Sequence, residues 1–301
     1  MKPAPFDYIA PTTIEEACGL LAEAGGGATL LAGGQTLMPL LNLRMSQPFI
    51  VVDLNKVTAL QGIERSGDGI RIGPMTRQCD VITSEVLARD LPSLVAAARH
   101  IGHHQTRNRG TIGGSIALGE PAAELPATAV ALGATLEIRS ARGVRQVPAG
   151  EFYLGPYMTV LEADELVTAI TFPAWPTGHT PLFRELARRP GDFALTGMVG
   201  ALAVENGSIA RAGLAWLGMG PTPIRATAAE QMLLGRSLDA IDPQAVADAA
   251  VADTSPFDDH HASADYRRTV GRRLFTRALR EALGLGPGTS LVTGVATGVT
   301  P

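Results

Sequence analysis

Two glycine pairs, Gly33-Gly34 and Gly113-Gly114, are the parts of the sequence with the clearest chemical meaning. A diphosphate is bound by several converging backbone N–H groups, and glycine leaves room for them because it has no Cβ. Neither pair fits the phosphate loop of nucleoside triphosphatases or the dinucleotide pattern G-x-G-x-x-G, and a single pair is also typical of a turn or a strand end. Two pairs together favour a nucleotide diphosphate held between two loops, without identifying the nucleotide. Candidate side-chain donors lie beside the pairs at Gln35, Thr36, Thr111 and Ser115.

Regular elements are expected on both sides of the first pair. The apolar run from Ala28 to Leu31 predicts a short buried strand that leads directly into Gly33, and the periodicity of Leu37 to Leu43 predicts a helix after it. Further upstream, Thr12 and Glu15 have the spacing of a capping box at the start of a helix. The first pair is therefore expected in a turn between a strand and a helix.

The second pair follows a helical segment, Val81 to Gly102 with a break near Pro92, and a loop rich in arginine and glycine. It opens a stretch of small residues, Gly113 to Ala134. Helices and strands alternate irregularly along the chain, so the sequence predicts an α+β fold rather than a doubly wound sheet. Other strands are predicted at residues 49–54, 69–73, 135–138, 144–147, 166–172, 183–186, 197–204 and 209–217, and other helices at 226–234, 243–252 and 263–283.

The proline-rich run Pro173 to Gly178 is typical of a linker. It divides the chain into a predicted domain of residues 1–175 and a smaller predicted domain of residues 176–285. Residues 286–301 contain Gly, Thr and Val without a period, which predicts a disordered tail.

Composition limits the classes of protein that the chain can belong to. It has 301 residues, of which 46% are hydrophobic and 18% charged, and this is typical of a globular protein. A net charge of −4 argues against a nucleic-acid partner, because phosphate binding depends on basic surface. No apolar run reaches the roughly 18 to 20 residues of a membrane span, and residues 1–10 lack the apolar stretch of a secretory signal. A cytoplasmic protein without a membrane span is therefore expected.

No metal site and no catalytic residue are predicted in this chain. The only cysteines are Cys18 and Cys79, whereas an iron–sulfur cluster usually takes four thiolates. The pairs His103-His104 and His260-His261 consist of neighbours, whose side chains point apart on a helix or strand, and no third ligand has metal-site spacing. No Ser/His/Asp or Cys/His set indicates a hydrolase. Any iron–sulfur cluster that serves this protein is expected on another chain.

Each glycine pair lies within a longer characteristic segment, and further characteristic segments follow along the chain. In this order they resemble the FAD-binding medium subunits of the molybdenum hydroxylase family, which includes xanthine dehydrogenase and carbon monoxide dehydrogenase. The first two segments resemble the flavin-binding loops of that family, and the resemblance extends to about Gly286. The segments are Leu30 to Arg44, Arg107 to Ser115, Pro121 to Pro126, Asp164 to Leu166, Arg188 to Ala194 and Ala262 to Arg268.

The resemblance implies an FAD-binding domain of two α+β subdomains, of the vanillyl-alcohol oxidase type, followed by a smaller α+β C-terminal domain. It also implies a complex with a molybdopterin-binding large subunit and a small subunit that carries two 2Fe–2S clusters, commonly as a dimer of heterotrimers. Substrate is then hydroxylated at molybdenum, and electrons pass through the clusters to FAD and on to an external acceptor. Neither the acceptor nor the substrate can be read from this chain; the family's substrates include carbon monoxide, aldehydes, purines and N-heterocycles.

The resemblance further implies cofactor contacts for individual residues. Glu124 stands where the family more often has Asp beside the flavin, and Arg184 stands where xanthine dehydrogenase relatives have a Lys facing the pyrimidine edge of the ring. Phe193 stands where an aromatic side chain covers one ring face. The expected cofactor-binding residues are Ala32, Gly33, Gly34, Gln35, Thr36, Leu37, Ile101, Thr111, Ile112, Gly113, Gly114, Ser115, Glu124, Val167, Arg184 and Phe193.

Two alternative functions remain open from the sequence. An autonomous flavin-dependent reductase or oxidase would act without a molybdenum partner. A non-catalytic assembly subunit would have lost the flavin, and the departures from the family pattern at Glu120 and Glu124 favour that hypothesis.

Overall fold

The computed structural model describes residues 2–67 and 69–286, and its N-terminal part is a three-stranded parallel sheet with two helices. The strand order is β1-β3-β2. Helix α1 begins after Thr13, whose hydroxyl accepts a hydrogen bond from the Glu16 N–H at 3.1 Å, one residue later than the predicted capping pattern. The elements are β1 (Asp7–Ile9), α1 (Ile14–Ala24), β2 (Ala28–Leu31), α2 (Leu37–Asn42) and β3 (Ile50–Asp53).

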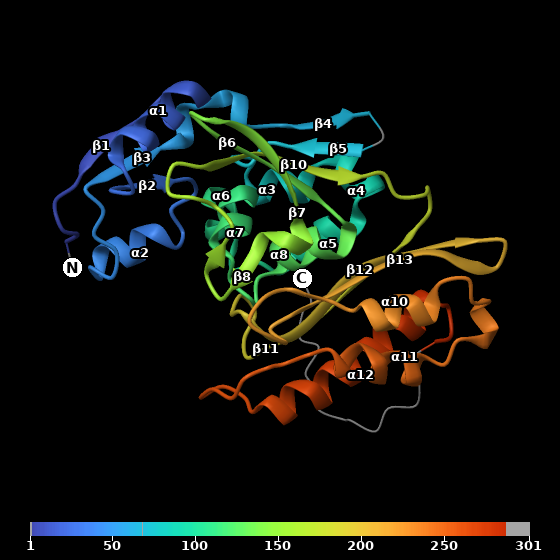
Figure 1. Cartoon of the computed structure of the whole chain (residues 1–301). Helices are drawn as coiled ribbons and strands as arrows, with labels where there is room; N and C mark the ends of the chain where they lie inside the picture. The colour runs from blue at the N-terminus through green and yellow to red at the C-terminus, as the bar shows by residue number, and fades with distance from the viewer. Residues whose placement is uncertain (1, 68, 287–301) are drawn as a thin grey trace.

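The middle part of the chain is a five-stranded antiparallel sheet in the order β4-β5-β10-β6-β7. Figure 1 shows helices α5, α7 and α8 beneath this sheet. The strands are β4 (Ile63–Ser66), β5 (Gly69–Ile72), β6 (Thr135–Ser140), β7 (Gly143–Pro148) and β10 (Leu166–Pro173), with a separate ribbon of β8 (Tyr153–Gly155) and β9 (Met158–Thr159). The helices are η1 (Leu54–Lys56), η2 (Thr58–Leu60), α3 (Gln78–Thr83), α4 (Glu85–Asp90), α5 (Pro92–His100), α6 (His104–Arg109), α7 (Ile112–Leu118), α8 (Glu124–Leu132) and α9 (Ala149–Phe152).

The C-terminal part is a four-stranded antiparallel sheet in the order β11-β12-β13-β14. Helix α12 packs against β11 and β12 from one side, while α5 and α8 pack against the sheet from the other. The middle and C-terminal parts therefore alternate sheet, helices, sheet and helices, as Figure 1 shows from top to bottom. The elements are β11 (Thr180–Ala187), β12 (Ala194–Glu205), β13 (Ser208–Leu217), β14 (Ile224–Arg225), α10 (Thr227–Leu233), η3 (Leu238–Ala240), α11 (Pro243–Ala252) and α12 (Ala264–Ala282).

Helix α8 joins the middle and C-terminal parts into one core. Every residue of this helix is buried, because it lies between the two sheets. Apolar side chains of the C-terminal sheet, such as Val199 and Ala215, belong to the same core cluster as Leu125 of α8 and Ile170 of β10. Small residues in α8 and in the facing strands allow this close packing, which agrees with the small-residue stretch recognised in the sequence.

The α+β fold class is confirmed, and the main differences from the predicted elements are local. The segment predicted as one broken helix forms three helices, α3, α4 and α5. The loop rich in arginine and glycine contains helix α6, whose residues have no apolar periodicity and are therefore hard to recognise as helical. Strand β4 was not predicted; of its four residues only Ile63 is apolar, so it lacks the alternation of a half-buried strand.

Residues 287–301, most of the predicted tail, lie outside the described part of the chain. Within residues 2–67 and 69–286, no helix is both long enough and apolar enough to cross a membrane.

We predict that G213A destabilises the protein. A Cβ at Gly213 of β13 would lie 2.3 Å from the Ala131 carbonyl oxygen in α8, so the helix and the sheet would have to move apart. The expected loss in the free energy of unfolding is about 1–3 kcal/mol, measured by denaturant titration. G150A is the matched control, since a Cβ at Gly150 would meet no atom within 4 Å. Equal stability of G213A and G150A would contradict the close packing of α8 on β13.

Candidate functional site

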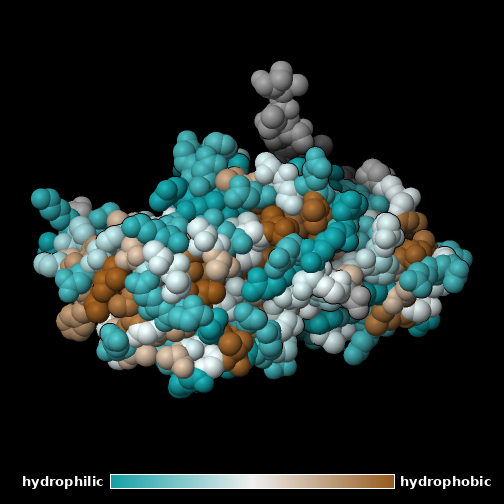
Figure 2. Space-filling view, turned by 90° about the horizontal axis from the view of Figure 1, so that it is seen from above, coloured by the Kyte–Doolittle hydropathy of each residue, from teal (hydrophilic) through white to brown (hydrophobic). Residues whose placement is uncertain are grey.

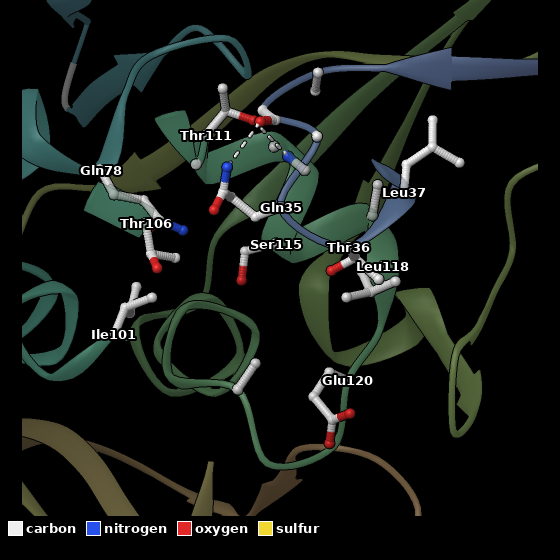
Figure 3. Close-up of a pocket in the computed structure, with 18 of the residues that line it drawn as sticks. Gln35, Thr36, Leu37, Gln78, Ile101, Thr106, Thr111, Ser115, Leu118 and Glu120 are labelled. Atoms are coloured by element: carbon white, nitrogen blue, oxygen red, sulfur yellow. Dashed lines mark hydrogen bonds between the residues drawn. The ribbon is translucent and has the colours of Figure 1, made fainter. Parts of the chain in front are cut away.

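A cavity of about 650 Å³ brings the two glycine loops together, and its size is within the range of cofactor and ligand sites. The first loop, residues 32–36, connects β2 to α2, and the second, residues 110–115, connects α6 to α7 and includes the first turn of α7. Figure 3 shows Gln35, Ser115 and Gln78 directed into the same space from the two loops and from α3. Residues far apart in the sequence thus surround one volume.

The first loop keeps its backbone N–H groups available. Within the described residues, no acceptor bonds the N–H groups of Gly33, Gly34, Gln35 or Thr36. Gly34 has a φ of 71°, a left-handed conformation that glycine adopts without strain. The Gln35 side chain folds back to donate a hydrogen bond to the Gly33 carbonyl at 3.3 Å (Figure 3). Such a row of unengaged N–H groups is suited to the oxygens of a diphosphate.

The second loop differs from the expectation that both glycine pairs offer N–H donors. The Gly113 N–H donates to the Pro74 carbonyl at 2.8 Å, and the Gly114 N–H donates to the Thr111 hydroxyl at 3.1 Å. A Cβ at Gly113 would lie 2.3 Å from Pro74 Cβ. The second pair therefore allows close packing, while the polar groups that this loop offers are side chains such as Ser115.

The two loops touch each other through their backbones. A Cβ at Gly33 would lie 2.5 Å from the Arg109 carbonyl oxygen and 2.8 Å from Gly110 Cα. Only glycine fits at residue 33 in this arrangement. The first glycine of the first pair is therefore required for the spacing of the two loops.

Most of the predicted site residues line this cavity, but two do not. Ile112 belongs to the second loop, but its side chain is fully buried in the apolar core. Arg184 lies on β11 with its side chain toward α12, where it forms an ion pair with Glu281. Side chains alternate along a strand, so the neighbouring Glu185 faces the opposite side of the sheet, toward His100. The predicted residues that line the cavity are Ala32, Gly33, Gly34, Gln35, Thr36, Leu37, Ile101, Thr111, Gly113, Gly114, Ser115, Glu124, Val167 and Phe193.

Several lining residues were not predicted from the sequence. Gln78 is 4% exposed, and its Oε1 atom is buried without a hydrogen-bond partner in the described part of the chain. Figure 3 shows the amide nitrogen of Gln78 directed into the cavity, where a ligand hydroxyl can accept a hydrogen bond from it. No glycine or recognisable motif marks Gln78 in the sequence. Other unpredicted lining residues include Pro74, Thr106, Leu118, Glu120 and Asp192.

A buried carboxyl group distinguishes the cavity wall. Burial raises the pKa of Glu124 to about 8, and the negative charges of Glu185 and Glu120 act in the same direction. Glu120 is held by Tyr157, whose hydroxyl donates to it, and by the Ala122 N–H at 3.0 Å. Glu124 is therefore mainly neutral at pH 7 and can donate a hydrogen bond into the cavity. Among the described residues, no three His, Cys, Asp or Glu side chains gather as metal ligands do.

Family models match almost the whole chain. Residues 4–175 match the model described as the FAD binding domain in molybdopterin dehydrogenase, and residues 181–282 match the CO dehydrogenase flavoprotein C-terminal domain. The chain is 41% identical over 284 residues to the 6-hydroxypseudooxynicotine dehydrogenase complex subunit alpha of Paenarthrobacter nicotinovorans, an alignment that covers 94% of this chain and 96% of the relative.

Solved structures agree with these matches. Carbon monoxide dehydrogenase from Hydrogenophaga pseudoflava superimposes with a TM-score of 0.91 at 39% identity, over 94% of this chain and 99% of that one. Quinoline 2-oxidoreductase from Pseudomonas putida 86 superimposes with a TM-score of 0.88 at 33% identity, over the same shares of the two chains. Fold and site thus define a flavoprotein of the molybdopterin-dependent oxidoreductases. Within this class, the chain belongs to the family of FAD-binding medium subunits, which confirms the resemblance found in the sequence.

We predict that E124Q changes how stability depends on pH. The folded-state pKa of Glu124, about 8, lies above the ordinary glutamate pKa of 4.5, so the unfolded chain ionises first as the pH rises. The wild type therefore loses stability between these two values, by at most about 1.4 kcal/mol per pH unit. E124Q does not ionise, so its stability relative to the wild type should increase from pH 5 to pH 8 in urea titrations. E151Q, at an exposed position of α9, is the control. If the stability of E124Q depended on pH in the same way as that of the wild type, Glu124 would be charged in the folded protein.

Proposed function

We propose that this chain is the FAD-carrying electron-transfer subunit of a heterotrimeric molybdenum hydroxylase. In this role it receives electrons from 2Fe–2S clusters of a partner subunit and passes them to an external acceptor, while the substrate is hydroxylated on the molybdenum subunit. The proposal rests on the cavity between the two loops in a chain that belongs to this family. In this cavity, four backbone N–H groups of the first loop have no hydrogen-bond partner among the described residues.

The residues of the cavity fit FAD. The first loop would hold the diphosphate, and Gln78, Thr111 and Ser115 would bond the ribityl hydroxyls. Apolar residues would pack against the ring system; they include Ile101, Leu118, Leu166, Val167 and Phe193. FAD supplies the electron-carrying chemistry when it is bound, and the protein supplies position and polarity.

The chain's own residues would position the cofactor and control its surroundings. Leu166 is 1% exposed and Val167 6%, so this side of the cavity excludes water. Phe193 is 58% exposed at the rim, where its ring is available to cover a bound ligand. Glu124 would hold a proton at its carboxyl group beside the ligand at neutral pH. None of these residues needs to act as a general base, because the substrate is oxidised on another subunit.

Partner subunits are the second element of the proposal. We propose a molybdopterin-binding large subunit and a 2Fe–2S small subunit, assembled as a dimer of heterotrimers. The face in Figure 2 is mainly hydrophilic with separate apolar areas. Large apolar side chains are exposed on the segment after α2, where Leu43 is 55%, Met45 73% and Phe49 80% exposed, and such side chains support burial against a partner.

The remaining predictions from the sequence stay proposals. The division into an FAD-binding domain of residues 1–175 and a C-terminal domain of residues 176–285 is supported by the bounds of the two family models. The cytoplasmic location stays a prediction. The relatives' names include quite different substrates, which agrees with a medium subunit that does not select the substrate.

We predict that the native complex contains molybdenum, iron and flavin. Purification through a tag on this chain, followed by metal analysis and an absorbance spectrum, should give about one molybdenum and four iron atoms per FAD. The same chain produced alone should bind FAD without these metals and should not oxidise the substrate of the complex, because that reaction takes place on another subunit.

Each alternative function predicts a different result of this purification. Flavin without molybdenum, iron or partner chains in the native preparation would indicate an autonomous reductase or oxidase. A complex with molybdenum and iron but without flavin would indicate an assembly subunit and would overturn the proposal.

A further inference from the structure

A pair of polar side chains behind the cavity connects the two loops. Asn55 follows β3, and its Nδ2 atom donates a hydrogen bond to the Ala32 carbonyl of the first loop at 3.1 Å. Arg77, directly before α3, donates to the Asn55 Oδ1 atom and also to the Arg109 carbonyl, directly before the second loop. Neither Asn55 nor Arg77 lines the cavity. We call these two residues the Asn55–Arg77 bridge.

The bridge is fixed at its Asn55 end. The Asn55 N–H and its side-chain amide both donate to Asp53 Oδ1, the backbone bond at 2.9 Å, and the Tyr8 hydroxyl donates to the other carboxylate oxygen. Burial raises the pKa of Asp53, but the hydrogen bonds from Tyr8 and Asn55 outweigh it, so this pKa lies below its usual value. Asp53 therefore stays charged at neutral pH and orients the amide of Asn55 toward Ala32.

The bridge is fixed at its Arg77 end by the backbone. The Gln78 N–H donates to the Gly110 carbonyl at 2.9 Å, and the Ile112 N–H donates to the Thr76 carbonyl at 3.0 Å. These bonds pair Arg77 with Thr111 across a short antiparallel bridge. The planar guanidinium can donate to two acceptors at fixed angles, which an ammonium group cannot reproduce.

We propose that Asn55 and Arg77 are positioning residues for the diphosphate of the cofactor. The inference rests on the proposed function, since it takes the first loop as the diphosphate site. The Ala32 carbonyl and the Gly33 N–H belong to the same peptide group. A hydrogen bond to that carbonyl polarises the peptide and strengthens its N–H as a donor toward an anion. Through Arg77, the same network sets the distance between the first loop and the Arg109 carbonyl, which Gly33 approaches most closely.

A purely structural role predicts something different. If the bridge only stabilised the fold, its loss would lower the stability of the cofactor-free chain and would weaken every ligand of the cavity equally. If it positions the diphosphate, its loss should weaken ligands that carry a diphosphate and spare those that lack one. Riboflavin contains the ring and the ribityl chain of FAD without the diphosphate, so it separates the two roles.

The test measures the affinity of the cofactor-free full chain for FAD and riboflavin by fluorescence titration, with its melting temperature as a further readout. For N55A and R77A we expect FAD affinity to fall about tenfold each, which corresponds to about 1.4 kcal/mol. Riboflavin affinity should change by less than about twofold. The double variant should lose less than the product of the single effects, because Arg77 acts on the first loop through Asn55. R77K should restore only part of the loss.

R142A is the matched control, since Arg142 also bonds two partners, Glu162 and Asp164, but does not contact either loop. Equal losses for FAD and riboflavin, or FAD affinities of N55A and R77A like that of R142A, would overturn the inference. If the wild type binds riboflavin too weakly to measure, ADP is used in its place. Because ADP carries the diphosphate, its affinity for the variants should fall together with that of FAD. An ADP affinity that is unchanged in N55A would also overturn the inference. A wild-type chain that binds no FAD would instead contradict the proposed function.

Discussion

The two loops of the cavity meet backbone to backbone, and the shape of the whole site depends on this contact. Gly33 lies so close to the Arg109 carbonyl and to Gly110 that a Cβ of residue 33 would be only 2.5 Å from the carbonyl oxygen. The contact joins the parallel sheet of the N-terminal part to the helices of the middle part. The cavity lies beside this contact, and its wall includes Glu120 and Glu124 of the middle part.

The opposite side of the site depends on α8. This helix begins at Glu124 in the cavity wall and runs between the two larger sheets, where all of its residues are buried. Burial raises the pKa of Glu124, the first residue of α8, so its carboxyl group is mainly neutral at pH 7. The apolar residues that follow in α8 share one core cluster with the C-terminal sheet, and they connect that sheet to the site. The C-terminal part therefore contributes to the site through packing as well as through its own loop, which places Asp192 and Phe193 at the cavity.

The first loop could be predicted from the local sequence, because a short apolar strand, two glycines and an amphipathic helix follow one another directly along the chain. The strand Ala28–Leu31 and the start of the helix at Leu37 agree with the structure. Features that depend on distant contacts could not be predicted. The side chain of Arg184 faces α12 because of the register and alternation of β11, and Asn55 matters only because the fold brings Ala32 beside it. The second glycine pair has the same local pattern as the first, yet its N–H groups are engaged by Pro74 and Thr111, which only the three-dimensional structure reveals.

In the proposed function, the first loop holds the diphosphate of FAD with its unengaged N–H groups. A crystal structure of the chain with bound FAD is the decisive measurement. We expect diphosphate oxygens within about 2.7–3.2 Å of the N–H nitrogens of residues 33–36, with the ring system beside Val167 and Phe193. A structure in which the diphosphate contacts neither glycine loop, or in which FAD binds outside this cavity, would contradict it.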